Sequence, residues 1–365
     1  MKNILLIASV YRCGQKMYPI IPFLSKQYNI DIYAFNQMSL KTPWFGTADP
    51  RPTFLKKCKK QGAKVIMGPS NVAVSKDYRN PKLARAINWS KYDLVLLDDN
   101  MAKGGWGTRM LCKLARKHNI PVIGSPHGNS EFKKISLQAD IGDIFDYSFV
   151  FGHKERRMLR KGGIANKLLP GGIPANDILA NYKRRNKYIL IIVSYVTKCS
   201  MKRNVNGYLP FTEHTYLSSG IADIQQKEGL PVIVKEKSRF KKGLDFSLKG
   251  LEKKYAGVSV VMDHPDNNRL VADAAVVISS PSTLCFKSIQ MGIPTILLRN
   301  FGMIGNFYDF DGLTNCNKSD VLKAYNRQKK RGLDKEFIID TLEGGIDFSS
   351  TQIYLKHIDN IMNQI

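Results

Sequence analysis

Short apolar runs alternate with amphipathic segments along the first half of the chain. The apolar runs predict strands over residues 3–9, 30–35, 64–67, 93–97, 121–123 and 147–151, and the segments between them predict helices over 19–27, 54–62 and 108–119. The connections are short and contain glycine, proline and asparagine. Such an alternation is typical of a parallel sheet that is covered by helices on both faces.

The pattern restarts after a polar and charged stretch at residues 180–186. Here we expect strands over 188–193, 231–234, 258–262, 275–278 and 295–298, and helices over 215–227, 248–255, 267–272, 319–329 and 351–364. A chain of 365 residues also exceeds the length that one hydrophobic core usually supports. We therefore predict an α/β protein with two Rossmann-like parallel-sheet domains that face each other across a cleft. The acceptor-side domain would cover 1–182 and the nucleotide-donor-binding domain 183–347, while the helix over 348–365 would pack back toward the first domain.

The segment from residue 275 to residue 298 carries the clearest chemical signal. Its first strand ends in a run of small hydroxyl residues, Ser279, Ser280, Ser282 and Thr283, and a helix follows. The first N–H groups of a helix lack intrahelical partners and attract anions. We therefore predict that these residues bind the pyrophosphate of a nucleotide-activated donor, although a plain Ser/Thr helix cap would give the same pattern.

A second group of candidates follows strands of the first domain. His127 lies at a strand end between Pro126 and Gly128, where a neutral imidazole is suited to act as a base toward an acceptor hydroxyl. Asp99 follows the neighbouring strand and would orient His127 or the acceptor, although adjacent aspartates also suit a turn. Trp106 and Arg109 then predict an acceptor loop with an aromatic platform and a cation.

Several further residues are candidate donor contacts. Gly171 and Gly172 give the backbone freedom to pass close to a ligand, and Asn176-Asp177 can cap the helix that follows them. Lys235 and Arg269 are candidate supporting cations, and His264 follows a strand where it would contact the donor or form a turn. No Asp-x-Asp pair ends a strand, so we expect neither a metal ion nor another cofactor.

Charge and cysteine usage suggest the setting in which the protein works. Lysine and arginine total 56 against 30 acidic residues, a net charge of +26 that attracts polyanions such as nucleic acid, an anionic membrane surface or a phosphate-rich polymer. A solvated, lysine-rich surface is the alternative. The 6 cysteines form no Cys-x-x-Cys pair and predict reduced thiols in a cytoplasmic protein. We find no signal peptide and no apolar run of about 20 residues that would span a bilayer.

Three motifs together resemble a known group of enzymes. The pair His127-Gly128, the run Gly171-Gly172-Ile-Pro-x-Asn-Asp-x-Leu and the block Ile278-Ser-Ser-x-Ser-Thr with Gly292-x-Pro294 resemble the GT-B transferases of the CDP-glycerol glycerophosphotransferase and capsule-polymer group. The resemblance implies a GT-B fold in which His127 supplies the base and the Ser/Thr cluster binds the donor pyrophosphate. Arg12-x-x-x-Lys16-Met17-x-Pro19 is also similar to UDP-N-acetylglucosamine 2-epimerases, which share that fold. We place Arg12 and Gly14 on the acceptor side.

The chain departs from both families at specific positions. Lys287 stands where these families usually place an acidic residue for the donor ribose, so either other groups hold the ribose or Lys287 points into solvent. Lys235-Glu236-Lys237-Ser238 stands where the transferases often have Lys-x-His-Pro. The paired glutamates of the epimerases are missing from the second domain, which argues against epimerase activity.

We therefore predict an enzyme that transfers a sugar or a glycerol-phosphate-like group from a nucleotide-sugar or CDP-alcohol donor to a hydroxyl of a polyanionic polymer. The motifs favour an acceptor of the teichoic-acid or capsule type, at the inner membrane face. The charge favours a second hypothesis, a virus-encoded DNA glycosyltransferase that acts on hydroxymethylated bases. A nucleotide-sugar epimerase is the third.

Overall fold

The computed structural model describes most of the chain. The described residues are 1–9, 16–34, 38–40, 49–68, 87–98, 106–126, 144–164, 167–193, 216–217, 220–236, 250–261, 264, 266–279, 284–298, 314–316, 320–332 and 334–365, with the backbone alone for 106–109, 236, 298 and 314–316. They form two units by their internal contacts. Unit 1 comprises Met1–Asp177 and Ile339–Ile365, and unit 2 comprises Ile178–Ile338.

Unit 1 is built on a parallel sheet of 7 strands in the order β3-β2-β1-β4-β5-β6-β7. The strands are β1 (Asn3–Ala8), β2 (Asn29–Ala34), β3 (Lys64–Met67), β4 (Leu94–Leu97), β5 (Val122–Gly124), β6 (Tyr147–Val150) and β7 (Lys167–Pro170). The helices are η1 (Tyr18–Ile20), α2 (Ile21–Gln27), α3 (Arg51–Lys60), η3 (Trp89–Lys91), α6 (Trp106–Lys117), α8 (His153–Lys161) and α16 (Ser350–Gln364). The short helix η7 (Pro174–Asn181) and helix α15 (Lys335–Thr341) span the two boundaries between the units.

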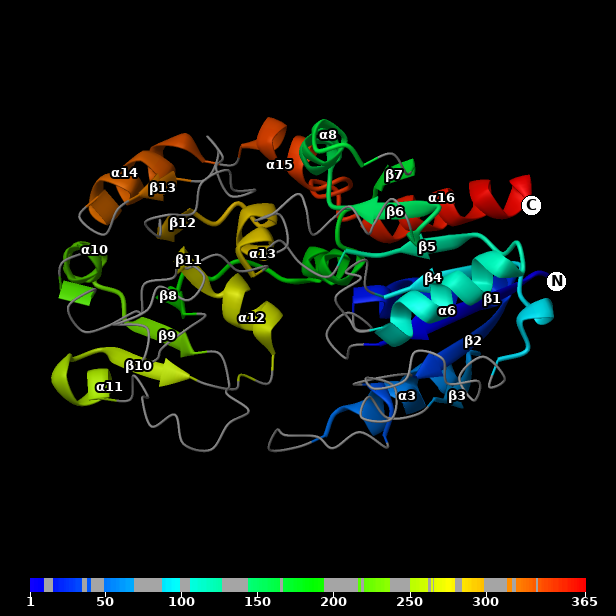
Figure 1. The fold of residues 1–365 in the computed structure, drawn as a ribbon. Helices are drawn as coiled ribbons and strands as arrows, with labels where there is room; N and C mark the ends of the chain where they lie inside the picture. Colours follow the sequence, from blue (N-terminus) through cyan, green and yellow to red (C-terminus); the bar gives the residue numbers. More distant parts are fainter. Residues whose placement is uncertain are drawn as a thin grey trace. The chain divides into compact units, whose positions relative to one another are not determined.

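Both faces of this sheet are buried, because its strands alternate between two hydrophobic clusters. Leu5 and Ile7 of β1 pack in one cluster with residues of α6 and α8. Ile4 and Leu6 pack in the other cluster with residues of α2, α3 and α16. Successive side chains of a strand point to opposite faces of the sheet, so a strand with apolar residues in sequence requires helices on both faces. Figure 1 shows α6 lying along one side of the sheet.

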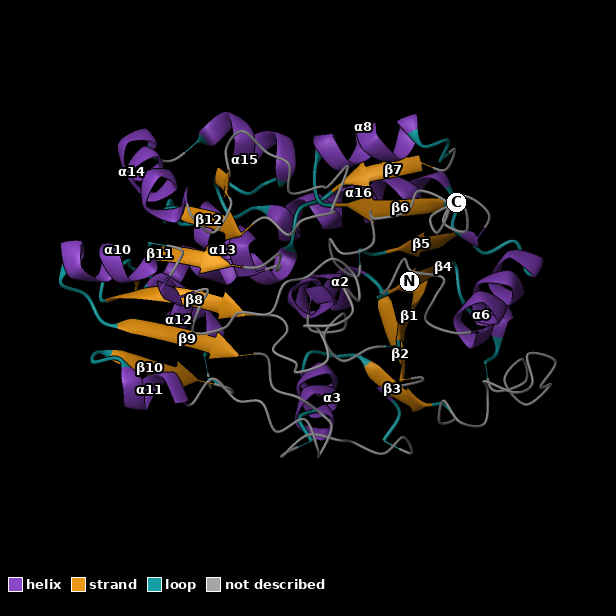
Figure 2. Ribbon diagram, turned by 60° about the vertical axis from the view of Figure 1, so that its left-hand side comes forward, coloured by secondary structure: helices purple, strands orange, loops and turns teal. Residues whose placement is uncertain are grey.

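Unit 2 repeats this architecture with 6 parallel strands in the order β10-β9-β8-β11-β12-β13. Figure 2 shows β10, β9, β8, β11 and β12 side by side in this order. The strands are β8 (Tyr188–Val193), β9 (Val232–Glu236), β10 (Val258–Val261), β11 (Ala274–Ser279), β12 (Thr295–Leu298) and β13 (Thr314–Cys316). Residues of α10 (Ile221–Glu228), α11 (Gly250–Lys254) and α14 (Val321–Arg331) share a cluster on one face. Residues of α12 (Asn267–Ala272) and α13 (Leu284–Gln290) cover the other.

The predicted fold class, two Rossmann-like parallel sheets in an α/β chain, is confirmed. Several short elements were not predicted, among them the helix η3 at Trp89–Lys91. Strand β7 is the short run Lys-Leu-Leu-Pro at one edge of its sheet, and β13 is the equally inconspicuous Thr-Asn-Cys at the edge of the other. Helix α15 was also missed, because Lys335–Thr341 forms only about two helical turns, which is too short to show a clear helical periodicity of apolar residues.

The C-terminal segment is part of unit 1. The Tyr28 hydroxyl donates to Asp359 Oδ1 of α16 at 2.8 Å. On the same helix, the Tyr354 ring stacks on Phe149 of β6 with 3.7 Å between the ring centroids. In the part of the chain that the structure describes, none of the helices combines the length and the apolarity that a bilayer crossing requires.

Candidate functional site

The strand and the helix that flank the residues predicted to bind the donor pyrophosphate are present in unit 2. Ser279 is the last residue of β11, is fully buried and pairs in register with Ile192 of β8 and Leu297 of β12. Helix α13 begins at Leu284. Ser280, Ser282 and Thr283 lie outside the described residues, so their contacts with a phosphate remain a prediction. The strand order reverses between β8 and β11, and open α/β sheets bind ligands beyond the carboxyl ends of strands at such a switch point.

Asp266 organises the neighbouring start of α12. Its carboxylate accepts hydrogen bonds from the backbone N–H of Asn268 at 2.9 Å and of Arg269 at 3.0 Å, and from the Tyr182 hydroxyl at 2.9 Å. Burial opposes ionisation here, but these hydrogen bonds hold the pKa of Asp266 below its usual value. His264 joins the same turn, because its Nδ1 accepts from the Asp266 N–H at 3.1 Å. An imidazole that accepts at Nδ1 carries its proton at Nε2 when neutral.

The two predicted cations of unit 2 lie in different surroundings. Arg269 forms an ion pair with Asp273 at 3.4 Å, and its guanidinium carbon is 5.2 Å from the centroid of the Tyr182 ring. Lys235 lies on β9, one residue before the strand ends, and is half-buried. Packing inside unit 2 accounts for the position of Arg269, and the roles of Arg269, Lys235 and His264 in donor binding stay predictions.

Lys287 does not point into solvent, so that alternative was wrong. Its amine donates a hydrogen bond to Asn268 Oδ1 on α12. Burial lowers the pKa of Lys287 to about 8, although the charge of Asp266 acts in the opposite direction. The sequence contained a signal for this burial, because Lys287 is the one charged residue of α13, Leu-Cys-Phe-Lys-Ser-Ile-Gln, and the structure exposes none of the residues of this helix.

Gly171 and Gly172 follow β7 in unit 1, and packing explains both glycines. A Cβ atom on Gly171 would lie 2.5 Å from Cε2 of Tyr354, and a Cβ atom on Gly172, whose φ is +72°, would lie 2.0 Å from the Glu343 carbonyl oxygen. The C-terminal segment therefore leaves no space for a side chain at either position. Their predicted contact with the donor is untested.

Asp177 caps a different helix from the one expected. Instead of capping η7, which contains it, Asp177 accepts hydrogen bonds from the N–H groups of Ser350 at 3.2 Å and Thr351 at 2.6 Å, at the start of α16. Burial raises the pKa of Asp177 against the effect of these bonds. The local sequence could not reveal this partner, because the helix that Asp177 caps lies far along the chain.

The predicted acceptor-side residues are only partly described. His127, Asp99, Arg12 and Gly14 lie outside the described residues. Trp106 and Arg109 belong to the first turn of α6, so the acceptor loop expected through residue 109 is instead helical from Trp106 onward. Nothing is described of their side chains.

Asp98, next to the predicted Asp99, has a structural role. It is buried, and its carboxylate accepts from the Ser9 hydroxyl at 2.6 Å and from the Ser9 N–H at 2.9 Å. These two bonds join the carboxyl ends of β1 and β4. Among the described residues, no group of histidine, cysteine and carboxylate side chains is arranged to hold a metal ion.

A buried carboxyl group at the carboxyl edge of this sheet was missed. Glu155 on α8 is 0% exposed, and burial raises its pKa to about 8. The sequence places it in the basic run Lys154-Glu-Arg-Arg157, which indicates a solvated helix face. Its position three residues after Gly152, where the helix begins, is the one signal that could have found it.

Comparisons with protein-family models and with curated proteins find no match. Solved structures, in contrast, resemble the chain over its whole length. A UDP-GlcNAc 2-epimerase of Methanocaldococcus jannaschii in complex with UDP-GlcNAc and UDP has a TM-score of 0.60 and 13% identity, covering 99% of this chain and 100% of its own. MnaA of S. aureus with UDP has a TM-score of 0.64 and 14% identity, covering 100% and 98%. The calicheamicin glycosyltransferase CalG4 has a TM-score of 0.55 and 12% identity, covering 100% and 99%.

At these identities the likeness establishes the fold. The protein therefore has the GT-B fold that the motifs implied, as do the epimerases and the glycosyltransferase that it resembles. The more specific resemblance to the CDP-glycerol and capsule-polymer transferases remains a prediction.

Proposed function

We propose that this protein is an enzyme that binds a nucleoside-diphosphate sugar in unit 2, with a UDP-sugar as the first candidate. The observation that carries the proposal is that β11 ends at Ser279 and α13 begins at Leu284, at the switch point of the unit 2 sheet. Similar structures of the same fold hold UDP or UDP-GlcNAc. The buried amine of Lys287 on α13, which donates to Asn268 of α12, adds positive charge to this part of unit 2 below its pKa of about 8.

Epimerisation of the bound sugar is the reaction that we place first. The sequence ranked it last, but the similar structures favour it over transfer, because UDP-GlcNAc 2-epimerases predominate among them. The absence of the paired glutamates counts against it. An epimerase requires no second substrate, so an assay from which the acceptor is left out distinguishes epimerisation from transfer.

Transfer to an acceptor is the second candidate. The likeness to CalG4 and the net charge of +26 support it, since a basic surface attracts a polyanionic acceptor. The envelope polymer and the hydroxymethylated DNA remain the two acceptors for this case, with His127 as the base and Asp99 as its partner.

The first experiment measures ligand binding by thermal unfolding. UDP, CDP, GDP and ADP, and then UDP-GlcNAc, are each added to the full-length protein. A ligand that binds only the folded state raises the unfolding temperature in proportion to the logarithm of its concentration. We expect UDP and UDP-GlcNAc to do so, and a protein that none of these ligands stabilises would refute the proposal.

The second experiment identifies the reaction. UDP-GlcNAc is incubated with the protein alone and followed by proton NMR, where an epimerase produces the C2 epimer without an acceptor. If the sugar nucleotide is unchanged until a labelled polymer primer or hydroxymethylated DNA is added, transfer is the reaction.

Two variants test whether UDP binds at the predicted donor turn. S282A and T283A should each weaken UDP binding by about tenfold if their hydroxyl groups bind the phosphates. S259A serves as the control, because Ser259 is exposed on the edge strand β10. Equal affinities in all three variants would remove the hydroxyl groups from the site.

A further inference from the structure

Glu155 is a fully buried ionisable group of unit 1. Its Oε2 accepts a hydrogen bond from the Phe151 N–H at 2.6 Å, at the carboxyl end of β6. Its Oε1 is buried and has no hydrogen-bond partner among the described residues. An ionised carboxylate in such a position would be costly, and a protonated one costs less. The carboxyl group is therefore neutral in the folded protein below its pKa of about 8.

Two other ionisable side chains face Glu155. The amine of Lys16 is close enough that its charge favours the ionised form of Glu155, and the phenol of Tyr354 on α16 feels the charge of Glu155 in turn. The phenol does not compete as a proton donor to solvent, because burial raises the pKa of Tyr354 further. On α8 itself, His153 pairs with Glu343 at 2.8 Å and Arg157 pairs with Asp340 at 2.6 Å.

Lys16 connects Glu155 to the end of β5. The Lys16 amine donates to the Pro126 carbonyl oxygen at 3.3 Å and lies 5.9 Å from the centroid of the Phe151 ring. The residue before Pro126, Ser125, is hydrogen-bonded with Tyr354 and donates to the Met17 sulfur at 2.9 Å. The segment Ser125–Pro126 at the carboxyl end of β5 is thus bonded to Lys16 through Pro126 and to Tyr354 through Ser125.

We propose that Glu155 is a positioning residue, which acts through the amine of Lys16 to hold the segment Ser125–Pro126 at the carboxyl edge of the unit 1 sheet. While Glu155 is neutral, the ammonium group of Lys16 donates to the Pro126 carbonyl. When Glu155 releases its proton to solvent, the new carboxylate attracts that ammonium group more strongly than a neutral carbonyl does, and Lys16 moves toward it. For catalysis, this inference rests on the proposed function, because Pro126 directly precedes the predicted base, His127.

A purely structural role for Glu155 makes different predictions. The bond from the Phe151 N–H would by itself stabilise the start of α8, and a neutral amide would serve this purpose as well as a carboxyl group does. E155Q therefore retains an acceptor oxygen but cannot ionise, whereas E155A removes both the acceptor and the titratable group. A structural residue is sensitive to E155A alone, but a positioning residue that acts through its charge also changes its pH response in E155Q.

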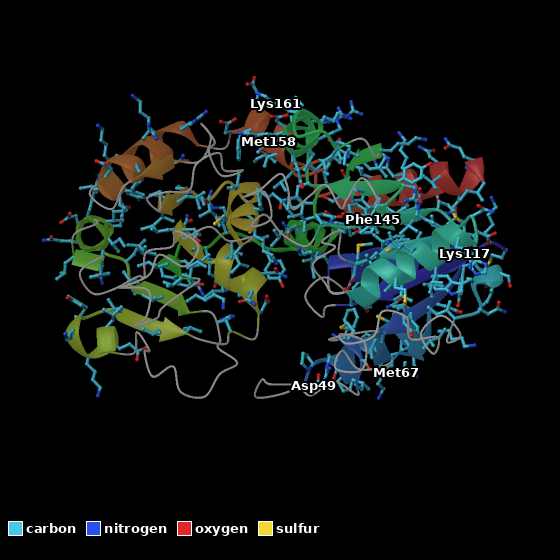
Figure 3. The ribbon with its side chains drawn as sticks, in the orientation of Figure 1. Asp49, Met67, Lys117, Phe145, Met158 and Lys161 are labelled. Carbon is cyan, nitrogen blue, oxygen red and sulfur yellow. The ribbon has the colours of Figure 1, made fainter. Side chains whose placement is uncertain are left out.

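The first test requires no substrate. Lysine side chains of the full-length protein are acylated with a trace of acetic anhydride between pH 7 and pH 10, and the rate at Lys16 is measured by peptide mass spectrometry. Exposed Lys161, the last residue of helix α8, which also carries Glu155, is the internal control (Figure 3). In the wild type, ionised Glu155 should protect the Lys16 amine above about pH 8. In E155Q this protection is absent, so Lys16 should react up to about tenfold faster at high pH, while Lys161 is unchanged.

The second test uses turnover of UDP-GlcNAc, or of the donor that proves active. The kcat of the wild type should decline as the pH rises through about 8, and this decline should be absent in E155Q, whereas the control E336Q, at an exposed glutamate, follows the wild type. Superimposable labelling curves at Lys16 for wild type and E155Q would overturn the inference whatever the reaction. A difference in labelling without turnover of any nucleotide-sugar would instead count against the proposed function alone.

Discussion

Glu155 and Lys287 are two ionisable side chains that the fold buries away from water. Burial moves their pKa values toward each other, to about 8 in each case, from the ordinary 4.5 and 10.5. Desolvation always disfavours the charged form, which is the anion for glutamate and the cation for lysine. The two groups therefore affect the stability of the folded protein in opposite ways as the pH changes.

The first prediction concerns E155Q. The folded protein keeps the proton on Glu155 up to about pH 8, whereas the unfolded chain loses it near 4.5, so the free energy of unfolding falls as the pH rises between these values. The slope from this group is at most about 1.4 kcal/mol per pH unit. Urea unfolding of wild type and E155Q from pH 5 to pH 9 should show that the variant lacks this slope. Parallel curves would mean that Glu155 is ionised in the folded state.

The second prediction concerns K287M. The unfolded chain keeps the Lys287 proton up to pH 10.5, whereas the folded protein loses it near pH 8. The wild type should therefore gain up to about 1.4 kcal/mol per pH unit between these values, and K287M should not. K253M, at an exposed lysine of α11, is the control and should follow the wild type. A K287M profile that matches the control would place the amine in water.

The candidate site was predictable from sequence only where a residue acts close to its own element. The strand and the helix that flank the run of hydroxyl residues after β11 were predictable, whereas the phosphate contacts of that run stay a prediction. Lys287 and Glu155 were missed in their roles, because each depends on a partner from another element: Asn268 in the first case and Lys16 in the second. Asp177, which caps the distant helix α16, shows the same limit.

At the scale of elements, the C-terminal segment determines which residues can follow β7. Gly172 has a φ of +72°, and a Cβ atom there would lie 2.0 Å from the backbone oxygen of Glu343. The central strands of both sheets were predictable, since their apolar runs are uninterrupted. The tight packing of Gly171 and Gly172, which follow β7, against Tyr354 and Glu343 was not predictable, because it joins parts of the chain that are remote in sequence.

This packing predicts a contrast between two glycines. G172A should destabilise the protein by at least about 2 kcal/mol, because backbone strain and a steric clash add. G163A has a similar φ of +85° with nothing within 4 Å, so it should lose only about 1 kcal/mol from the strain. Chemical denaturation measures both. If the two variants were equally stable, the C-terminal segment would shift to make room for a side chain at position 172, and packing would no longer explain the glycine.

At the scale of the whole molecule, the excess positive charge has no single location among the described helices. Lys56, Lys59 and Lys60 are exposed on α3 of unit 1, and Lys323, Arg327 and Lys330 are exposed on α14 of unit 2. A net charge of +26 that is spread in this way attracts any polyanion, and such binding weakens steeply with salt because counterions are released.

The last prediction separates this diffuse attraction from a dedicated docking surface. Two triple variants, K56Q/K59Q/K60Q on α3 and K323Q/R327Q/K330Q on α14, remove the same number of charges from different units. We expect both to weaken binding of duplex DNA by the same factor and to reduce the salt slope equally, by about 0.9 for each phosphate that the variant no longer neutralises. Fluorescence anisotropy of labelled DNA at a series of salt concentrations measures both quantities. Weaker binding in only one of the two variants would instead locate an acceptor surface on that helix, and would favour transfer to a polyanion over epimerisation of the nucleotide-sugar.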